Sequence, residues 1–361
     1  MNSTSAASYM ATALQLAARG RYSSFPNPRV GCLIVKDGKI VGQGWHARAG
    51  EPHAEIHALR EAGKNARGAD VYVTLEPCAH RGRTGPCAQV LIEAGVHKVT
   101  GAMQDPNPLV AGKGFAALNN AGIETECGVL EQAARTLNRG FVSRMQRGRP
   151  FVTLKLGASL DGRTAMASGE SKWITSEASR ADVHRLRAEA GAVLTSAATV
   201  LADDPELNLR WFKQSDRQPD RIVLDAGRKV GATARVWADD GASRWWVVGA
   251  NVMSFADAAA MSEVAEAPRP PLSDILSQLA QQQINSVLVE SGPILAGALL
   301  KAQLVDELVL YLAPQLLGSD ARAMALIPGL ERLVDRIELS FQEVRLVGPD
   351  LRVTAVPKLK D

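Results

Sequence analysis

The 361-residue sequence has no long apolar run, and none of its hydrophobic stretches approaches the roughly 18 residues that suggest a membrane span. Aromatic residues make up only 5%, and 41 Lys and Arg nearly balance 38 Asp and Glu, which leaves a net charge of +3. A nucleic-acid-binding surface needs a basic face that carries aromatic side chains. We therefore expect neither a membrane nor a nucleic acid as a partner.

Cysteine is also scarce. Four cysteines in so long a chain do not make a disulfide scaffold, so each thiol is either a buried packing residue or a functional ligand. The mildly apolar stretch from Ala6 to Ala18 is followed by Arg19 and Arg21 and has no basic residue before it, which is the reverse of a secretory signal. These features predict a cytoplasmic protein.

What the sequence does have is the composition of a globular protein, with 46% hydrophobic and 22% charged residues and the length of two domains. Strand patterns alternate with helix patterns in both halves, which is typical of α/β layers. The alternation breaks at the polar turn Arg147–Pro150. We therefore predict one α/β domain over residues 1–146 and a second over residues 151–361.

Apolar spacing and turn residues place the individual elements. In the first half the expected order is helix Tyr9–Ala18, a hairpin of Val30–Val35 and Ile40–Val41, a helix opening at Glu51–Glu55 with Ile56, Leu59 and Ala62 on one side, strand Asp70–Leu75, helix Cys87–Glu93, strand Val96–Gly101, helix Gly114–Asn120 and strand Ile123–Cys127. In the second half it is strand Phe151–Leu156, a helix after Ser176, and strands Ala192–Thr195, Arg221–Asp225, Trp245–Gly249 and Asn285–Glu290.

Potential metal ligands are concentrated near the N-terminus. They are Cys32, Cys78, Cys87, His46, His53, His57, His80 and His97. Any one of them is more often a core or surface residue. Three differ in context, because His53, Cys78 and Cys87 each follow a proline where a strand ends or a helix begins, and a helix N-terminus favours a thiolate.

Spacing alone leaves two kinds of zinc site open. His57 lies four residues after His53 on the same helix face, so His57 or His80 would complete a closed structural site with His53 and the two cysteines. The alternative is an open site with three protein ligands. Glu55 favours the open site, because a carboxylate beside the metal can move a proton without being a ligand. We therefore predict that His57 and His80 stay off the metal.

The segments His53–Glu55 and Pro77–Cys87 resemble the H-x-E and P-C-x-x-C motifs of the zinc deaminases in the cytidine deaminase superfamily. Eight residues separate the two cysteines here instead of two, and this longer insert with Gly82–Thr84 resembles the deaminases of the riboflavin pathway. Asn27–Cys32 is similar to their substrate-side loop. The resemblance implies Zn²⁺ held by two thiolates and one imidazole.

After residue 150 there is no G-x-G-x-x-G and no phosphate-loop motif, so the second half on its own does not indicate a nucleotide enzyme. Its best local signal is the apolar run Ser286–Val289 followed by Glu290–Pro293. A strand, a glycine turn and a helix that opens with proline would place free N–H groups where phosphates bind in α/β sheets. An ordinary strand-to-helix turn explains the pattern equally well.

The segments Lys155–Arg163, Ser171–Thr175, Thr199–Pro205 and Glu290–Pro293 resemble the reductase half of the bifunctional deaminase–reductases of riboflavin biosynthesis. The resemblance runs from about Tyr9 to Val356. It implies a cytidine-deaminase-like domain followed by a dihydrofolate-reductase-like domain. It also implies deamination of diaminohydroxyphosphoribosylaminopyrimidine and then NADPH-dependent reduction of the ribosyl side chain to ribityl, in a homo-oligomer that is a dimer or a tetramer.

The same resemblance assigns individual residues. The metal ligands would be His53, Cys78 and Cys87, with Glu55 as the catalytic proton carrier. NADPH would contact Gly157, Trp173, Thr199, Asp203, Gly292, Pro293, Ile294, Leu295, Ala296, Gly297 and Ala298. The phosphorylated pyrimidine would contact Ser171, Arg187, Leu207, Arg210 and Glu290.

Two further points concern the cofactor. Ala226 stands where relatives often carry a serine that touches NADPH. We therefore assign no hydrogen bond to the cofactor at this position. Arg228 and Lys229 are candidates for the 2′-phosphate contact, although basic residues in a turn are more often simply solvated.

Overall fold

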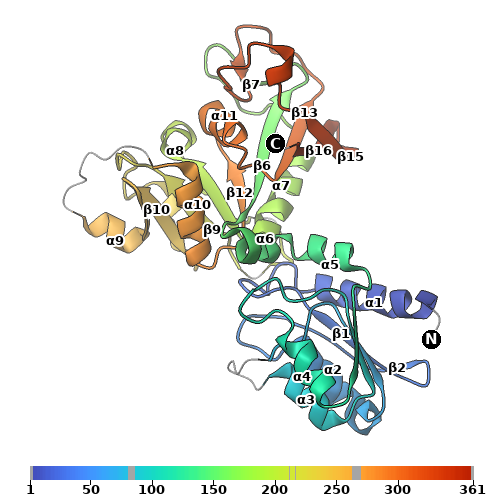
Figure 1. The fold of residues 1–361 in the computed structure, drawn as a ribbon. Helices are drawn as coiled ribbons and strands as arrows, with labels where there is room; N and C mark the ends of the chain where they lie inside the picture. Colours follow the sequence, from blue (N-terminus) through green and yellow to red (C-terminus); the bar gives the residue numbers. More distant parts are fainter. Residues whose placement is uncertain (1–2, 80–85, 211, 216, 262–269, 359–361) are drawn as a thin grey trace. The chain divides into compact units, whose positions relative to one another are not determined.

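The computed structural model describes residues 3–79, 86–210, 212–215, 217–261 and 270–358. The chain divides into two compact units, Met1–Gly148 and Arg149–Asp361 (Figure 1). None of the described helices is long and apolar enough to cross a membrane.

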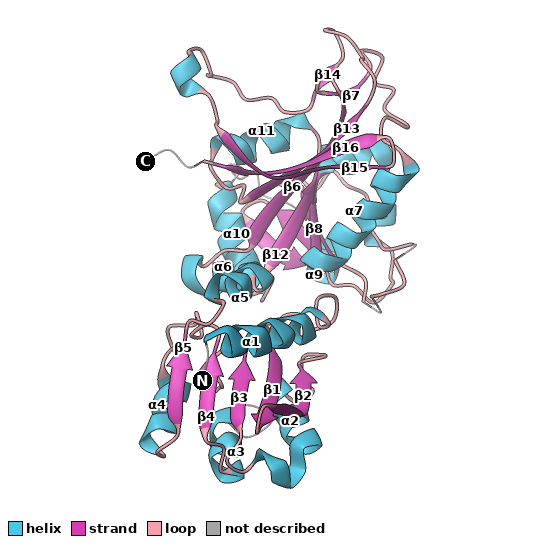
Figure 2. Ribbon diagram, turned by 90° about the vertical axis from the view of Figure 1, so that its right-hand side faces the viewer, coloured by secondary structure: helices cyan, strands magenta, loops and turns pink. Residues whose placement is uncertain are grey.

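The first unit is a five-stranded sheet with helices on both faces (Figure 2). Its elements are α1 (Ser3–Ala18), β1 (Gly31–Lys36), β2 (Lys39–Trp45), α2 (Ala54–Ala62), the 3-10 turn η1 (Gly63–Ala66), β3 (Asp70–Val73), α3 (Cys87–Ala94), β4 (Lys98–Gly101), α4 (Lys113–Asn120), β5 (Glu124–Cys127), α5 (Glu131–Leu137) and α6 (Arg139–Arg147). The strand order is β2-β1-β3-β4-β5, with β1 antiparallel to β2 and β3 and the remaining pairs parallel.

Strand β1 shows how the sequence builds the two layers. Cys32 and Ile34 face the core formed with α2, α3 and α4, whereas Leu33 and Val35 face the core formed with α1 and α5. Helix α2 lies close against β2, since a Cβ on Gly44 would come within 2.3 Å of the Ala54 carbonyl oxygen. This close packing fixes the helix start where His53 and Glu55 lie.

The second unit contains a nine-stranded sheet in the order β11-β10-β9-β8-β12-β6-β13-β16-β15. Its strands are β6 (Phe151–Ser159), β7 (Arg163–Ala165), β8 (Ala192–Ser196), β9 (Asp220–Leu224), β10 (Arg244–Val248), β11 (Asn251–Ser254), β12 (Ser286–Glu290), β13 (Glu307–Ala313), β14 (Arg322–Ala323), β15 (Leu339–Val347) and β16 (Asp350–Pro357), of which β7 and β14 form a separate pair. Its helices are α7 (Glu177–Ala190), α8 (Ala197–Asp203), α9 (Phe255–Ala260), α10 (Leu272–Gln281) and α11 (Pro293–Lys301), with 3-10 turns η2 (Arg235–Trp237) and η3 (Leu333–Asp335).

The six strands from β10 to β13 are parallel, and the C-terminal hairpin β15–β16 adds to β13 antiparallel. In β12, Val287 and Val289 face the core formed with α10 and α11, while Leu288 packs beneath α7. Parallel strands covered on both faces read as continuous apolar runs, which is why this segment is so hydrophobic. Glu290 ends the run at the carboxyl edge of the sheet.

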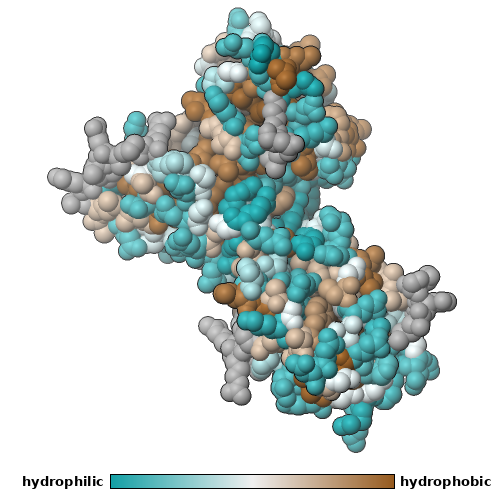
Figure 3. Space-filling model, viewed as in Figure 1, coloured by the Kyte–Doolittle hydropathy of each residue, from teal (hydrophilic) through white to brown (hydrophobic). Residues whose placement is uncertain are grey.

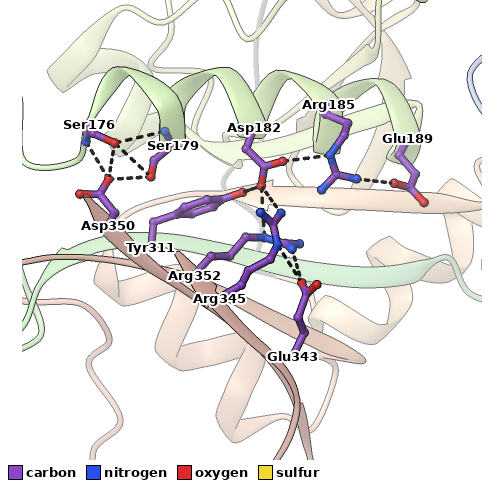
Figure 4. Close-up of polar contacts among 10 residues, drawn as sticks. All are labelled: Ser176, Ser179, Asp182, Arg185, Glu189, Tyr311, Glu343, Arg345, Asp350 and Arg352. Atoms are coloured by element: carbon purple, nitrogen blue, oxygen red, sulfur yellow. Dashed lines mark hydrogen bonds and ion pairs between the residues drawn. The ribbon is translucent and has the colours of Figure 1, made fainter. Parts of the chain in front are cut away.

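A polar network fastens α7 to the C-terminal hairpin (Figure 4). The Asp182 carboxylate accepts hydrogen bonds from the Tyr311 hydroxyl at 2.5 Å and from Arg185 at 2.9 Å, and it lies 3.2 Å from Arg352 Nε. At the start of α7, the Asp350 carboxylate accepts hydrogen bonds from Ser176 and Ser179. These bonds fix the helix that carries His184 and Arg187.

The predicted α/β class and every strand and helix expected above are present, with ends that differ by up to a few residues. The buried side of α2 was predicted imperfectly. Ala54, Glu55, Ala58 and Ala62 are its buried residues, whereas Ile56 and Leu59 are only partly buried. Small side chains are needed there because β2 presents glycines to the helix.

Candidate active sites

The imidazole and the two thiols singled out in the sequence lie together in the first unit. His53 directly precedes α2, Cys78 follows β3, and Cys87 is the first residue of α3. His53 Nδ1 is 3.2 Å from Cys87 Sγ and 3.6 Å from Cys78 Sγ. The three donor atoms all lie within 4.8 Å of one another.

This arrangement fits a zinc ion. At bond lengths of about 2.3 Å to sulfur and about 2.1 Å to nitrogen, neighbouring ligands on one tetrahedral ion are roughly 3.6 Å apart. Within the described part of the chain, no fourth His or Cys joins the cluster, and His57 lies outside it. Three protein donors with one position open is the arrangement of catalytic zinc sites. His80 and the rest of segment 80–85 lie outside the described residues.

Hydrogen bonds within the cluster shift the pKa values of the two thiols in opposite directions. The hydrogen bond from Cys87 lowers the pKa of Cys78, and the contact with His53 lowers it further. The same Cys78–Cys87 bond, together with burial, raises the pKa of Cys87. The Cys87 backbone N–H at the start of α3 also points to Cys78 Sγ at 3.3 Å. The site therefore stabilises a thiolate at Cys78.

Glu55 is buried in the first turn of α2, with 3% of its surface exposed. Burial raises the pKa of its carboxyl group, while the nearby His53 lowers it. The carboxyl group also hydrogen-bonds Cys87. Glu55 therefore lies against the cluster of His53, Cys78 and Cys87, with its carboxyl group in hydrogen-bond contact with Cys87.

The loop expected on the substrate side reaches this site through a histidine. Asn27 Nδ2 lies 3.0 Å from Nε2 of the buried His46, and the His46 ring packs edge-on against His53 at 5.4 Å. Burial lowers the pKa of His46, which favours the neutral ring. Asn27 and His46 thus lie next to the cluster of His53, Cys78 and Cys87.

Glu76 is a buried carboxylate that the sequence reasoning did not single out. It accepts backbone N–H bonds from Asp105, Gly112, Gly114 and Phe115, at 2.7 to 3.3 Å. It thereby ties the start of α4 to the segment that carries Cys78. Its position directly before Pro77 was the available signal, but an isolated acidic residue after a strand has many ordinary explanations.

The second unit holds a cluster of charges on the face covered by α7. Arg187 donates to the Glu290 carboxylate through Nε at 2.5 Å and through a terminal nitrogen at 3.1 Å, and to the Asn208 carbonyl at 2.9 Å. Lys155 Nζ lies 3.8 Å from the same carboxylate. Burial alone would raise the pKa of Glu290, but Arg187 and Lys155 lower it to about 2.

Lys155 is the second residue that the sequence reasoning missed as a site residue. A lysine inside the apolar strand Phe151–Leu156 was a readable signal, because buried lysines are rare without a partner. Burial lowers the pKa of its ammonium group, against the pull of Glu290. Gly157 lies beside it, since a Cβ on Gly157 would be 4.0 Å from Lys155 Nζ.

His184 and Leu207 complete this region. His184 is buried one turn before Arg187, and burial with the neighbouring Arg187 and Arg210 lowers its pKa to about 4. Leu207 is buried with a φ of 53°, a left-handed conformation that costs a non-glycine residue energy. Arg210 is half-exposed and pairs with Glu206.

A cavity of about 470 Å³ opens at the carboxyl edge of β8, β9 and β10, with α10 and α11 on its flank. Its size suits a nucleotide portion, and its place is where open α/β sheets bind ligands. Ile294, Leu295 and Ala298 line it, and the Gly292 N–H at the start of α11 donates to Thr199 Oγ1 at 3.3 Å. The residues at this edge fit NADPH.

Some residues assigned by resemblance lie elsewhere. Ala296 is buried in the core, and Gly297 packs against the Leu326 backbone, so neither faces the cavity. Trp173 is 71% exposed beneath the Arg180 guanidinium, and Asp203 is exposed at the end of α8. No contact joins Ser171 to the charge cluster within the described chain.

Comparisons with known proteins identify the families that the two units resemble. The family model for the cytidine and deoxycytidylate deaminase zinc-binding region matches residues 3–103, and that for the RibD C-terminal domain matches residues 150–353. Riboflavin biosynthesis protein RibD of Escherichia coli (strain K12) is 53% identical over 361 residues, covering 95% of this chain and 97% of that protein. The protein of the same name from Haemophilus influenzae is 48% identical, covering 97% of each.

Solved structures extend the likeness to the fold. RibD of Acinetobacter baumannii superposes with a TM-score of 0.90 at 44% identity, covering 99% of this chain and 100% of that one. A Thermotoga maritima diaminohydroxyphosphoribosylaminopyrimidine deaminase/5-amino-6-(5-phosphoribosylamino)uracil reductase gives 0.85 at 32% identity with the same coverage. The predicted order of a deaminase-like and a reductase-type domain is thereby confirmed. The chain belongs to the RibD family of riboflavin biosynthesis proteins.

Proposed function

We propose that this chain catalyses two consecutive steps of riboflavin biosynthesis. The first is hydrolytic deamination of 2,5-diamino-6-ribosylamino-4(3H)-pyrimidinone 5′-phosphate by residues 1–146. The second is NADPH-dependent reduction of the ribosyl side chain to ribityl by residues 151–361. The observation that carries the proposal is the cluster of His53, Cys78 and Cys87 with Glu55 against it, in a chain similar to RibD along its whole length.

In the deamination, zinc would act as a Lewis acid that lowers the pKa of a water molecule. Glu55 takes a proton from that water as the oxygen attacks the ring carbon that bears the amino group. The same carboxyl group then delivers the proton to the departing nitrogen, so that ammonia leaves, and the proton of the remaining hydroxyl moves to the ring nitrogen as the carbonyl forms. His53, Cys78 and Cys87 hold the metal, and Asn27 with His46 borders the substrate.

In the reduction, NADPH would supply the hydride. The ribosyl C1 accepts it in the ring-opened form, and the adjoining nitrogen needs one proton. Lys155, whose pKa is lowered by burial, is placed to give that proton, with Glu290 holding the side chain and Arg210 the phosphate. Arg187 positions Glu290 through its two hydrogen bonds.

The direct test is an assay of the purified protein with the diaminopyrimidine substrate and NADPH. Ammonia release and NADPH oxidation are followed separately. We expect both, with ammonia release first. Absence of ammonia release from a zinc-loaded, folded protein would overturn the proposal.

A metal analysis tests the ligand assignment. We expect about one zinc per chain in the wild type and in His57→Ala, and strong depletion in His53→Ala, because His53 is the one histidine of the described residues that lies with the two thiols. His57→Ala is a matched control, since it removes an imidazole from α2, the helix that begins directly after His53. Equal depletion of both variants would contradict the three-ligand site.

We also propose that the chain forms a homo-oligomer, a dimer or a tetramer. β15 is an edge strand, and Phe341, Val344 and Leu346 on it are 69%, 53% and 70% exposed. The hydropathy surface shows apolar groups at this strand and over η3 (Figure 3). Exposed apolar rows of this kind mark protein interfaces.

Light scattering provides the corresponding prediction. Phe341→Glu should shift the molar mass toward that of one chain, because a charge on an apolar interface is costly to bury. Gln342→Glu, a charge on the neighbouring exposed residue, should leave the mass unchanged. A wild-type mass of one chain would contradict the proposal.

We further place the protein in the cytoplasm, because its two site thiols must stay reduced.

A further inference from the structure

Glu76 is a buried carboxylate to which neither proposed reaction assigns a role. It is 5% exposed, and no Lys or Arg side chain pairs with it in the part of the chain that the structure describes. Burying a charge without a counter-charge costs solvation free energy that a neutral side chain would not cost. Backbone N–H groups compensate the charge instead, so the role of this carboxylate follows from what those N–H groups belong to.

Both oxygens of the Glu76 carboxylate accept hydrogen bonds. Oε2 accepts the N–H of Asp105 at 3.1 Å and the N–H of Gly112 at 2.9 Å. Oε1 accepts the N–H of Gly114 at 2.7 Å and the N–H of Phe115 at 3.3 Å. Asp105 and Gly112 lie in the segment between β4 and α4, and the other two residues belong to the first turn of α4. Only a side chain with two acceptor oxygens can hold both pairs.

The backbone around Glu76 is held as closely as its side chain. The Glu76 N–H donates to the Met103 carbonyl oxygen at 2.9 Å. A Cβ on Gly114 would come within 1.9 Å of the Pro77 carbonyl oxygen, so α4 begins directly against Pro77. The ring of Pro77 fixes its own φ. The placement that is set at Glu76 therefore passes to Cys78 with little conformational freedom.

Cys78 is held from its other side by α3. Its carbonyl oxygen accepts the Ala88 N–H at 3.2 Å, and its Sγ lies 3.3 Å from the Cys87 backbone nitrogen. The turn that carries this sulfur is thus fixed between α3 and α4 by contacts of the protein itself. Groups that orient the ligands of a metal ion without binding the ion commonly contribute about tenfold to a hundredfold to its affinity.

We propose that Glu76 is a positioning residue of the metal site, which places Cys78 for Zn²⁺ by anchoring the segment Glu76–Cys78 to the start of α4 and to the loop before it. Glu76 is not itself a ligand and acts through the backbone. Its contribution is a zinc affinity that is higher by about tenfold to a hundredfold. This inference rests on the proposed function, because it takes His53, Cys78 and Cys87 as the zinc ligands.

The test is a competitive zinc titration of the reduced, full-length protein against a chromophoric chelator of known zinc affinity. Glu76→Gln keeps the shape of the side chain but turns an NH₂ group toward two of the four N–H donors. We expect its zinc affinity to fall by about tenfold to a hundredfold. Leu16→Ala is the matched control, because it removes a buried side chain from the core on the opposite face of the sheet. It destabilises the same unit and should leave the zinc affinity unchanged.

Amide hydrogen exchange on the same proteins measures the anchor itself. Exchange in residues 104–115 should be faster in Glu76→Gln than in the wild type, because the N–H groups that the carboxylate binds lie there. Leu16→Ala should not change exchange in this segment. Wild-type exchange of the segment in Glu76→Gln would overturn the inference, because the anchor would then not depend on the carboxylate.

The zinc titration separates the inference from the proposed function. If Glu76→Gln binds zinc as tightly as the wild type, or if Leu16→Ala loses as much affinity as Glu76→Gln, the positioning role is wrong while the proposed function stands. If the wild type binds zinc no more tightly than His53→Ala, the ligand assignment fails and the inference fails with it.

Discussion

Glu55→Gln should reduce ammonia release by at least about a hundredfold, the lower range for loss of a general acid or base. The substitution keeps the size of the side chain and removes its ability to take up a proton. Because Glu55 is not among the three clustered donor atoms, zinc content should stay at the wild-type level. Ammonia release by a coupled assay and zinc by elemental analysis are measured on the same preparation.

Two controls make this result specific. Glu61→Gln changes an exposed carboxylate on the same helix and should leave ammonia release unchanged. The Glu55→Gln protein, supplied with the already deaminated pyrimidine, should oxidise NADPH at close to the normal rate, because the charge cluster that we assign to reduction belongs to the other unit. Near-normal deamination by Glu55→Gln would remove Glu55 from the mechanism.

The metal site was accessible from sequence because its residues are marked by local context. His53, Cys78 and Cys87 stand at helix starts or after a strand, next to prolines, and such positions bring side chains to one edge of a sheet. Glu76 was not accessible in this way. Its four backbone partners lie 29 to 39 residues further along the chain, and only the fold shows that they converge on it.

In the second unit, local sequence patterns predict the elements but not which of their side chains face the cavity. The strand and helix around Gly292 were predicted, but the resemblance assigned a continuous run from Gly292 to Ala298 to the cofactor. In a helix only one side can face a cavity, so Ala296 and Gly297 face the core instead. Similarly, Arg187 was expected to contact the phosphorylated pyrimidine, and only the fold shows that its N–H groups donate to Glu290 and Asn208.

The C-terminal hairpin was not predicted at all. In β15, a bulge between Phe341 and Glu343 breaks the period-two alternation on which strand prediction depends. A strand usually places its apolar residues toward the core and its charged residues toward solvent. In β15 the apolar residues are exposed at the edge of the sheet, and the charged residues face α7. The ion pairs of Asp182 with Arg345 and Arg352 join elements that are far apart in sequence, so local patterns do not predict them (Figure 4).

Glu290→Gln should abolish most reduction and leave ammonia release intact. The carboxylate is 12% exposed and pairs with Arg187 and Lys155, which are 11% and 21% exposed, so its loss leaves two largely buried cations without this anion. Breaking a buried pair in this way costs about 3 to 5 kcal/mol in the free energy of unfolding. NADPH oxidation with the deaminated pyrimidine should fall by at least about a hundredfold, the range for removing a preorganised charge from an active site.

The pH dependence gives an independent check on the same residue. The folded-state pKa of Glu290 is about 2, below its value of roughly 4.3 in an unfolded chain. A lowered folded-state pKa means that the ion pair's stabilisation is fully present above the unfolded-state pKa and is lost as the pH falls toward 2. The difference in the free energy of unfolding between wild type and Glu290→Gln should therefore be constant from pH 7 to about 5 and shrink below pH 4.

Tryptophan fluorescence during urea unfolding measures this difference, since all the tryptophans except Trp45 belong to the second unit. Glu189→Gln is the matched control on α7, because its partner Arg185 lies in a partly exposed pair that is worth about 1 kcal/mol or less. Glu189→Gln should reduce the pyrimidine normally. If Glu290→Gln loses ammonia release together with reduction while both units remain folded, the two reactions share one site and the division at residue 148 does not separate them.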